Sequence, residues 1–93
     1  MTTIAFDVDG TLIHQVGELE DTPRYDVINL LIWFLHNGNE VFIWSGGGVN
    51  YAENWCQKLG LSKEVIVIEK GSFVPDIAID DKEVELGKTN IRV

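Results

Sequence analysis

The sequence predicts an α/β fold in which helices alternate with the strands of a short parallel sheet. Short, continuously apolar runs recur along the chain, helical segments separate the first three of them, and glycines mark the boundaries. Strands of parallel sheets are buried on both faces, and such runs are typical of them. At 93 residues, 45% of them apolar, the chain makes one domain over residues 1–93. We therefore expect a three-layer, Rossmann-like domain with four or five strands.

The predicted elements run in the order strand, helix, strand, helix, strand, strand, with a weak strand last. Their ranges are 3–8, 23–37, 41–44, 49–59, 65–68, 76–79 and 90–93. Residues 10–22 are polar and glycine-containing, which predicts a loop or small hairpin. The connection 69–75 is too short for a helical crossover. Fully extended, it spans roughly 23 Å, enough to pass beneath neighbouring strands that lie ~4.8 Å apart.

The first helix has clear boundary signals and an unusual apolar surface. Thr22 is a typical N-cap, Pro23 suits the first helical position, and Gly38 is the expected C′ residue. Apolar side chains occupy more than one stripe of the helix, which predicts burial on more than one side. Either the chain covers this helix twice or a second copy does. The helix over 23–37 is therefore a candidate homodimer surface.

Composition excludes several classes of protein. The formal net charge is −8, and the seven basic residues are scattered, so the sequence has no basic stripe for nucleic acid. No apolar stretch approaches the ~20 residues of a membrane span, and we expect no membrane association. Cys56 is the only cysteine and cannot form an internal disulfide. We therefore expect a reducing, cytoplasmic location.

Polar residues stand where the predicted strands end. They are acids after the first and fourth strands, a serine after the second and a lysine beyond the third: Asp7, Asp9, Ser45, Lys70, Asp80 and Asp81. The carboxyl ends of parallel strands share one edge of the sheet, where open α/β sheets bind their ligands. Clustered carboxylates that lose water need a positive partner. Oxygen ligands alone select a hard cation, so we expect Mg²⁺.

At these positions the sequence resembles the haloacid dehalogenase-like (HAD) superfamily of phosphatases and phosphotransferases. "DVDGT" (7–11) matches the first family motif, and "VFIWS" (41–45) matches the second, an apolar strand ending in serine or threonine. Lys70 stands in the place of the third motif, and "DIAIDD" (76–81) matches the fourth. The four motifs occur in the family's order. The resemblance implies a HAD-like hydrolase, a Mg²⁺-dependent phosphatase of phosphomonoesters.

The resemblance also implies roles for individual residues. Asp7 would be the nucleophile that forms an aspartyl-phosphate. Asp9 would be the general acid for the leaving oxygen and then the general base for the hydrolytic water. Ser45 and the amide of Gly46 would hold phosphoryl oxygens, with Thr11 as a further substrate contact.

The implied cofactor is Mg²⁺, held between the first and fourth strand ends. Its candidate ligands are Asp7, the backbone carbonyl of Val8, Asp9, Asp80 and Asp81. We favour Asp81 as the direct ligand and Asp80 as the acid behind it. Lys70 would neutralise charge on the phosphoryl group, with Lys82 or Lys88 as alternatives for this role.

Family members often carry a cap domain after the first strand or between the third and fourth. Here these insertion points hold about thirteen and seven residues, so we expect a capless core with an open site. Capless relatives tend to act on phosphorylated macromolecules or to borrow a lid from a neighbouring subunit. The expected partner is therefore a phosphorylated substrate, macromolecules included.

Three other functions stay open on the sequence alone. A HAD-fold phosphotransferase shares the phosphatase chemistry, and a non-catalytic Mg²⁺- or phosphate-binding module would retain the fold. A signalling receiver domain uses similar residues but carries its phosphorylated aspartate after the third strand, where this chain has Ile68 and Glu69. Among the aromatic residues, Tyr51 is a candidate substrate contact, and the others are expected mainly in the core.

Overall fold

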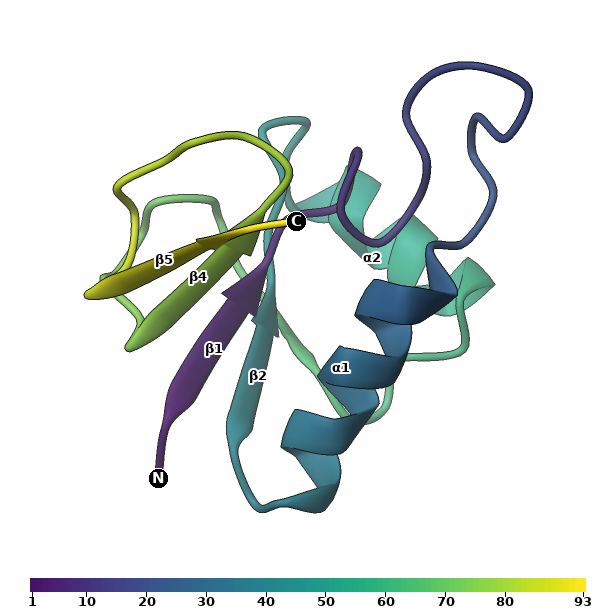
Figure 1. Cartoon of the computed structure of the whole chain (residues 1–93). Helices are drawn as coiled ribbons and strands as arrows, with labels where there is room; N and C mark the ends of the chain where they lie inside the picture. The colour runs from purple at the N-terminus through teal and green to yellow at the C-terminus, as the bar shows by residue number, and fades with distance from the viewer.

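The computed structural model describes residues 1–93 and contains five strands and two helices (Figure 1). The strands are β1 (Thr3–Phe6), β2 (Glu40–Ile43), β3 (Ile66–Val67), β4 (Ile77–Asp80) and β5 (Thr89–Arg92), and the helices are α1 (Tyr25–His36) and α2 (Val49–Lys58). All strands are parallel, in the order β3-β2-β1-β4-β5. The predicted α/β fold with a short parallel sheet is confirmed, including its weak last strand.

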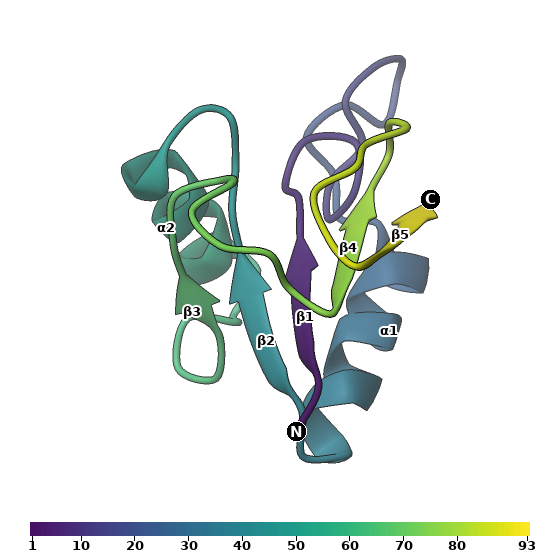
Figure 2. The same cartoon turned by 90° about the vertical axis from the view of Figure 1, so that its left-hand side faces the viewer.

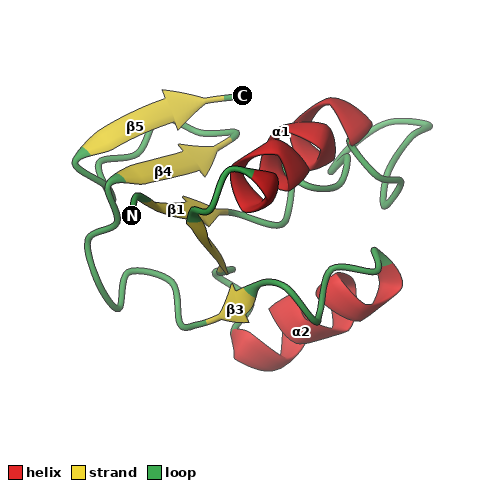
Figure 3. Ribbon diagram, turned by 90° about the horizontal axis from the view of Figure 1, so that it is seen from below, coloured by secondary structure: helices red, strands yellow, loops and turns green.

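The strand order places a crevice beside the central strand. The chain moves from β1 to β2 to β3 in one direction, so two right-handed crossovers put α1 and α2 on the same face (Figure 3). The connection from β3 then returns across β2 and β1 to form β4 on the other side of β1. The order therefore reverses between β1 and β4, and such a switch point opens a ligand crevice at the strands' carboxyl ends.

The main core lies between the sheet and the two helices. Phe6, Ile43 and Ile79, from three adjacent strands, are fully buried there. Leu31 of α1 and Ala52 of α2 pack into the same cluster. This shared cluster holds both helices against the sheet and thereby fixes the loops that lead into and out of them.

Helix α1 is buried along one side only. Val27, Ile28 and Leu31 form its buried face, while Tyr25 and Trp33 are 67% and 57% exposed. The chain therefore covers α1 on one side only, and the alternative in which it covers the helix twice is wrong. Neither helix is long and apolar enough to cross a bilayer.

Loops rather than helices form the layer on the opposite face of the sheet. Ala5 and Trp44 are buried beneath the connection 69–75, which Figure 2 shows passing over β2 and β1 before it enters β4. Phe73 of this connection meets Phe42 edge-on at 4.7 Å between ring centroids, and Trp44 at 6.1 Å. The seven residues therefore cross the neighbouring strands as expected, on the face away from the helices, and Phe73 anchors them.

The predicted start of α1 is wrong by two residues. Thr22 does not cap the helix, because its hydroxyl donates to the carbonyl of Leu19 in the preceding loop. Pro23 is still extended and pairs antiparallel with Ile13. The loop before α1 folds as a small hairpin, one of the two structures predicted for it. The His14 N–H donates to the Thr22 carbonyl at 2.9 Å. The helix begins only after this pairing ends.

Candidate functional site

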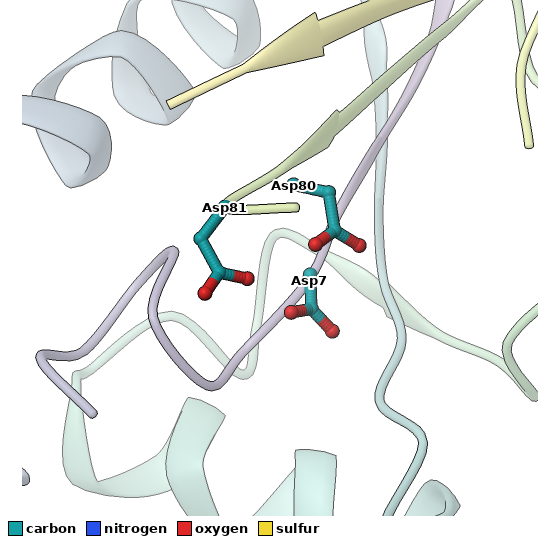
Figure 4. A group of neighbouring side chains, drawn as sticks. All are labelled: Asp7, Asp80 and Asp81. Carbon is teal, nitrogen blue, oxygen red and sulfur yellow. The ribbon is translucent and has the colours of Figure 1, made fainter. Parts of the chain in front are cut away.

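Three acids meet at the carboxyl edge of the sheet, beside the switch point. Asp7 directly follows β1, and its N–H donates to the Ile79 carbonyl of β4 at 3.0 Å, so strand pairing fixes its position. Asp80 ends β4 and Asp81 follows it. One carboxylate oxygen from each of Asp7, Asp80 and Asp81 lies within 4.8 Å of the other two (Figure 4).

Lys70 brings one positive charge to these acids. Its ammonium donates to Asp7 Oδ1 at 3.1 Å and to Asp80 Oδ2 at 3.0 Å. Neither alternative lysine takes this place: Lys88 pairs with an acid at the opposite edge of the sheet, and Lys82 makes no ion pair. One ammonium among three carboxylates leaves the cluster negatively charged when all three are ionised.

Burial makes this negative charge unfavourable. It raises the pKa of Asp7 to about 6, with the charge of Asp80 adding to the rise and Lys70 opposing it. Burial also raises the pKa of Asp81, again helped by the neighbouring Asp80. For Lys70, burial acts to lower the pKa, but Asp80 and Asp7 outweigh it and the pKa is raised. Asp7 and Asp81 therefore bind protons more readily than free carboxyl groups, which is how sites short of positive charge behave.

The cluster has the donor set of a hard divalent cation. Its ligands would be carboxylate oxygens, which Mg²⁺ prefers, and no histidine or thiol is among them. Asp81 Oδ1 is buried and has no hydrogen-bond partner. Buried polar atoms are normally paired, so this oxygen is available to a ligand. Asp7, Asp80 and Asp81 therefore fit Mg²⁺.

The Val8 carbonyl, expected as a metal ligand, is instead taken up by hydrogen bonds within the turn after β1. That oxygen accepts hydrogen bonds from the N–H groups of Thr11, Leu12 and Ile13, at 3.1, 2.9 and 3.3 Å. Val8 is also fully buried, so the expected carbonyl ligand is not available. Nor does the structure bring Thr11 to the cleft: its side chain is fully buried inside the same turn. Of the residues in this turn, Asp9 alone faces the site.

Gly10 keeps Asp81 in place by having no side chain. Its φ is +77°, and a Cβ there would lie 2.1 Å from Asp81 Oδ2. We expect Gly10→Ala to displace the Asp81 carboxylate and to weaken Mg²⁺ binding by at least about tenfold, the equivalent of losing one charged contact. Calorimetric titration with Mg²⁺ measures this change.

Gly17→Ala is the matched control for Gly10→Ala. Gly17 has a similar φ, +83°, and no atom within 4 Å of an added Cβ. Alanine there meets the same left-handed backbone penalty of about 1 kcal/mol, without the collision. Equal Mg²⁺ affinities in the two variants would contradict the assignment of Asp81 as a ligand.

Ser45 and the glycines after β2 form the wall of the site on the β2 side of Asp7, away from Asp80 and Asp81 on the β4 side. Ser45 is 4% exposed, and its Oγ accepts the N–H of Gly47 at 3.0 Å. A Cβ on Gly46 would meet nothing within 4 Å, so the Gly46 backbone borders open space. Main-chain N–H groups in such a turn are suited to bind an anion.

These residues line one cleft of about 220 Å³. Its walls are almost entirely polar: Asp7, Asp9, Gln15, Ser45, Gly46, Gly47, Lys70, Asp80, Asp81, Lys82 and Val84. The expected site residues other than Val8 and Thr11 are all present. Gln15 was missed because nothing in a polar loop marks which side chain turns inward. Lys82 directly follows the paired acids, and this position in the sequence could have predicted that it lines the cleft.

Tyr51 contacts Asp9 rather than standing free for substrate. Its hydroxyl donates to Asp9 Oδ1 at 2.6 Å. The hydrogen bond to Asp9, with burial, raises the pKa of Tyr51, so the hydroxyl keeps its proton at neutral pH. Its place in the first turn of α2, after the glycines, was the available sequence signal.

Comparison with protein-family models, with curated proteins and with solved structures finds no match to this chain.

Proposed function

We propose that this protein is a Mg²⁺-dependent phosphatase of phosphomonoesters with HAD-like chemistry. One observation carries the proposal: Lys70 bridges Asp7 and Asp80 at the switch point, beside Asp81 and opposite Ser45. The residues that would serve as nucleophile, charge-neutralising ammonium, cation ligands and anion-binding amides line one cleft. Phosphoryl transfer through an aspartyl-phosphate would use all four of these parts.

The reaction would proceed in two steps on the chain's own residues. Asp7 attacks phosphorus and forms an aspartyl-phosphate, while the ester oxygen leaves with a proton from Asp9. Asp9 then takes a proton from water, which attacks the aspartyl-phosphate and releases phosphate with Asp7 regenerated. Lys70 and the Gly46 amide would balance charge on the phosphoryl oxygens. Bound Mg²⁺ would offset the repulsion between the carboxylates and the phosphate dianion.

The proposed substrates include large phosphomonoesters. No domain is inserted between β1 and α1 or between β3 and β4, so neither connection carries a cap domain. The β1–α1 connection contributes only Gln15 to the walls beyond the first motif. We therefore expect phosphorylated macromolecules to reach Asp7 as readily as small esters do.

Release of inorganic phosphate from an aryl phosphate, with Mg²⁺ or with a chelator, tests the proposal. We expect turnover only with Mg²⁺, and phosphopeptides and oligonucleotide 5′-phosphates should serve as further substrates. A phosphotransferase would give phosphate release that an alcohol acceptor suppresses. Mg²⁺ binding without turnover on any ester would contradict the proposal and indicate a binding module.

Mg²⁺ should also stabilise the fold, because the cluster exists only when β1 and β4 are paired. A ligand present at 100 times its Kd raises the free energy of unfolding by about 2.7 kcal/mol. We expect Mg²⁺ to raise the melting temperature of the wild type but not of Asp81→Asn. Glu64→Gln, which neutralises an exposed acid just before β3, should retain the full effect.

A further inference from the structure

A short hydrogen bond links the acid–base candidate to a second element of the fold. Tyr51 of α2 donates its hydroxyl to Asp9 Oδ1 at 2.6 Å. O–H bonds to carboxylates at such distances are roughly twice as strong as those between neutral groups. Asp9 lines the cleft, and its other oxygen, Oδ2, takes no hydrogen bond from the protein. One oxygen of Asp9 is held by Tyr51, and the other takes no hydrogen bond.

The phosphate-binding turn itself holds the Tyr51 ring in position. A Cβ on Gly47 would lie 3.0 Å from ring atom Cδ2 and 3.1 Å from Cγ, so the ring rests directly against this glycine. Gly47 also donates its N–H to Ser45 Oγ. Tyr51 therefore sits between the turn that would bind the phosphoryl group and the acid that would protonate the leaving oxygen.

We propose that Tyr51 is the positioning residue for Asp9, an inference that rests on the proposed function. The hydroxyl fixes Oδ1, so that the proton is exchanged at Oδ2. In the first step the Oδ2–H bond breaks, its proton passes to the leaving ester oxygen, and the electron pair stays on Asp9. The O–H of Tyr51 stabilises the carboxylate formed. In the second step Oδ2 takes a proton from water, and Tyr51 keeps its own proton throughout.

Tyr51→Phe tests this role because it removes one oxygen and leaves the ring. Esters with poor leaving groups depend on general acid help, whereas 4-nitrophenyl phosphate hardly needs it. We expect kcat for an alkyl phosphate to fall about tenfold, with 4-nitrophenyl phosphate changing less than about threefold.

Tyr25→Phe is the matched control, because Tyr25, the only other tyrosine, is 67% exposed on α1 and makes no side-chain hydrogen bond. It should leave kcat for both esters unchanged. In an Asp9→Asn background Tyr51→Phe should have no further effect on 4-nitrophenyl phosphate, since Tyr51 acts through Asp9.

The outcomes separate this inference from the proposed function. If the wild type is active and Tyr51→Phe slows both esters equally, the phosphatase stands and the positioning role is wrong. A raised KM with an unchanged kcat would make Tyr51 a substrate contact instead, which also overturns it. A wild type that releases no phosphate from any ester contradicts the proposed function and this role with it.

Discussion

Replacing Asp7 by asparagine is expected to abolish phosphate release while stabilising the metal-free protein. The amide cannot form the acyl-phosphate bond, so kcat should fall by on the order of a thousandfold or more. Asparagine keeps the shape of the side chain and removes a negative charge that burial and Asp80 both disfavour. One substitution should therefore move activity and stability in opposite directions.

The pH dependence of this stabilisation follows from the raised pKa of Asp7. The group titrates near 3.8 in an unperturbed carboxyl and at about 6 in the folded protein, which therefore holds the proton more tightly. The contribution of protonated Asp7 to stability is complete below pH 3.8 and is lost as the pH rises through 6. Above that, the ionised group costs up to about 3 kcal/mol, which asparagine avoids.

Thermal unfolding in a chelator at pH 4 and pH 8 measures this difference. Asp7→Asn should melt several degrees above the wild type at pH 8 and close to it at pH 4. Asp26→Asn is the control: Arg24 lowers the pKa of this exposed carboxyl, so its removal should bring no gain at pH 8. An Asp7→Asn protein less stable than wild type at pH 8 would contradict the electrostatic account of the site.

Lys70→Met should have the opposite effect on stability and the same effect on activity. The ammonium lies 3.1 Å from Asp7 and 3.0 Å from Asp80, whose side chains are only 9% and 3% exposed. Removing it leaves two buried carboxylates without a counter-charge, which typically costs about 3–5 kcal/mol. Methionine retains most of the aliphatic stem, so the loss measures the charge rather than the packing.

Chemical denaturation of Lys70→Met in a chelator measures this loss, and two conditions should reduce it. At pH 5 Asp7 is mostly protonated, and with Mg²⁺ the cation replaces the missing charge. Lys88→Met is the matched control, because Lys88 is 71% exposed and its pair with Asp76, at 3.5 Å, is worth about 1 kcal/mol or less. Similar losses in both variants would show that Lys70 contributes no more than a surface lysine.

The sequence predicted which residues would meet, but not how each would be oriented. Asp7, Ser45 and Asp80 end apolar strands, and parallel pairing brings such ends together whatever the details of the loops. Val8 and Thr11 lie in a turn whose backbone hydrogen bonds decide which groups point inward, and motif spacing does not encode that choice.

The start of α1 was misjudged for a similar reason. Thr22 and Pro23 satisfy the local rules for a helix start, but the pairing of Pro23 with Ile13 keeps the chain extended. The contact of Tyr51 with Asp9 joins positions 42 residues apart. The place of Tyr51 after the glycines was a sequence signal that it lies near the site, but only the folded chain shows its contact with Asp9.

The connection 69–75 supplies Lys70 to the cleft and also covers one face of the sheet. The reactivity of the site therefore depends on whether this connection opens locally. Within residues 69–75 the single hydrogen bond between main-chain groups runs from Ser72 to Glu69, so the side chains of Lys70 and Phe73 attach this connection to the sheet. Local opening of residues 69–75 would withdraw Lys70 from the cleft while every strand stayed paired. The amides of this connection should therefore exchange with deuterium well before those of β1.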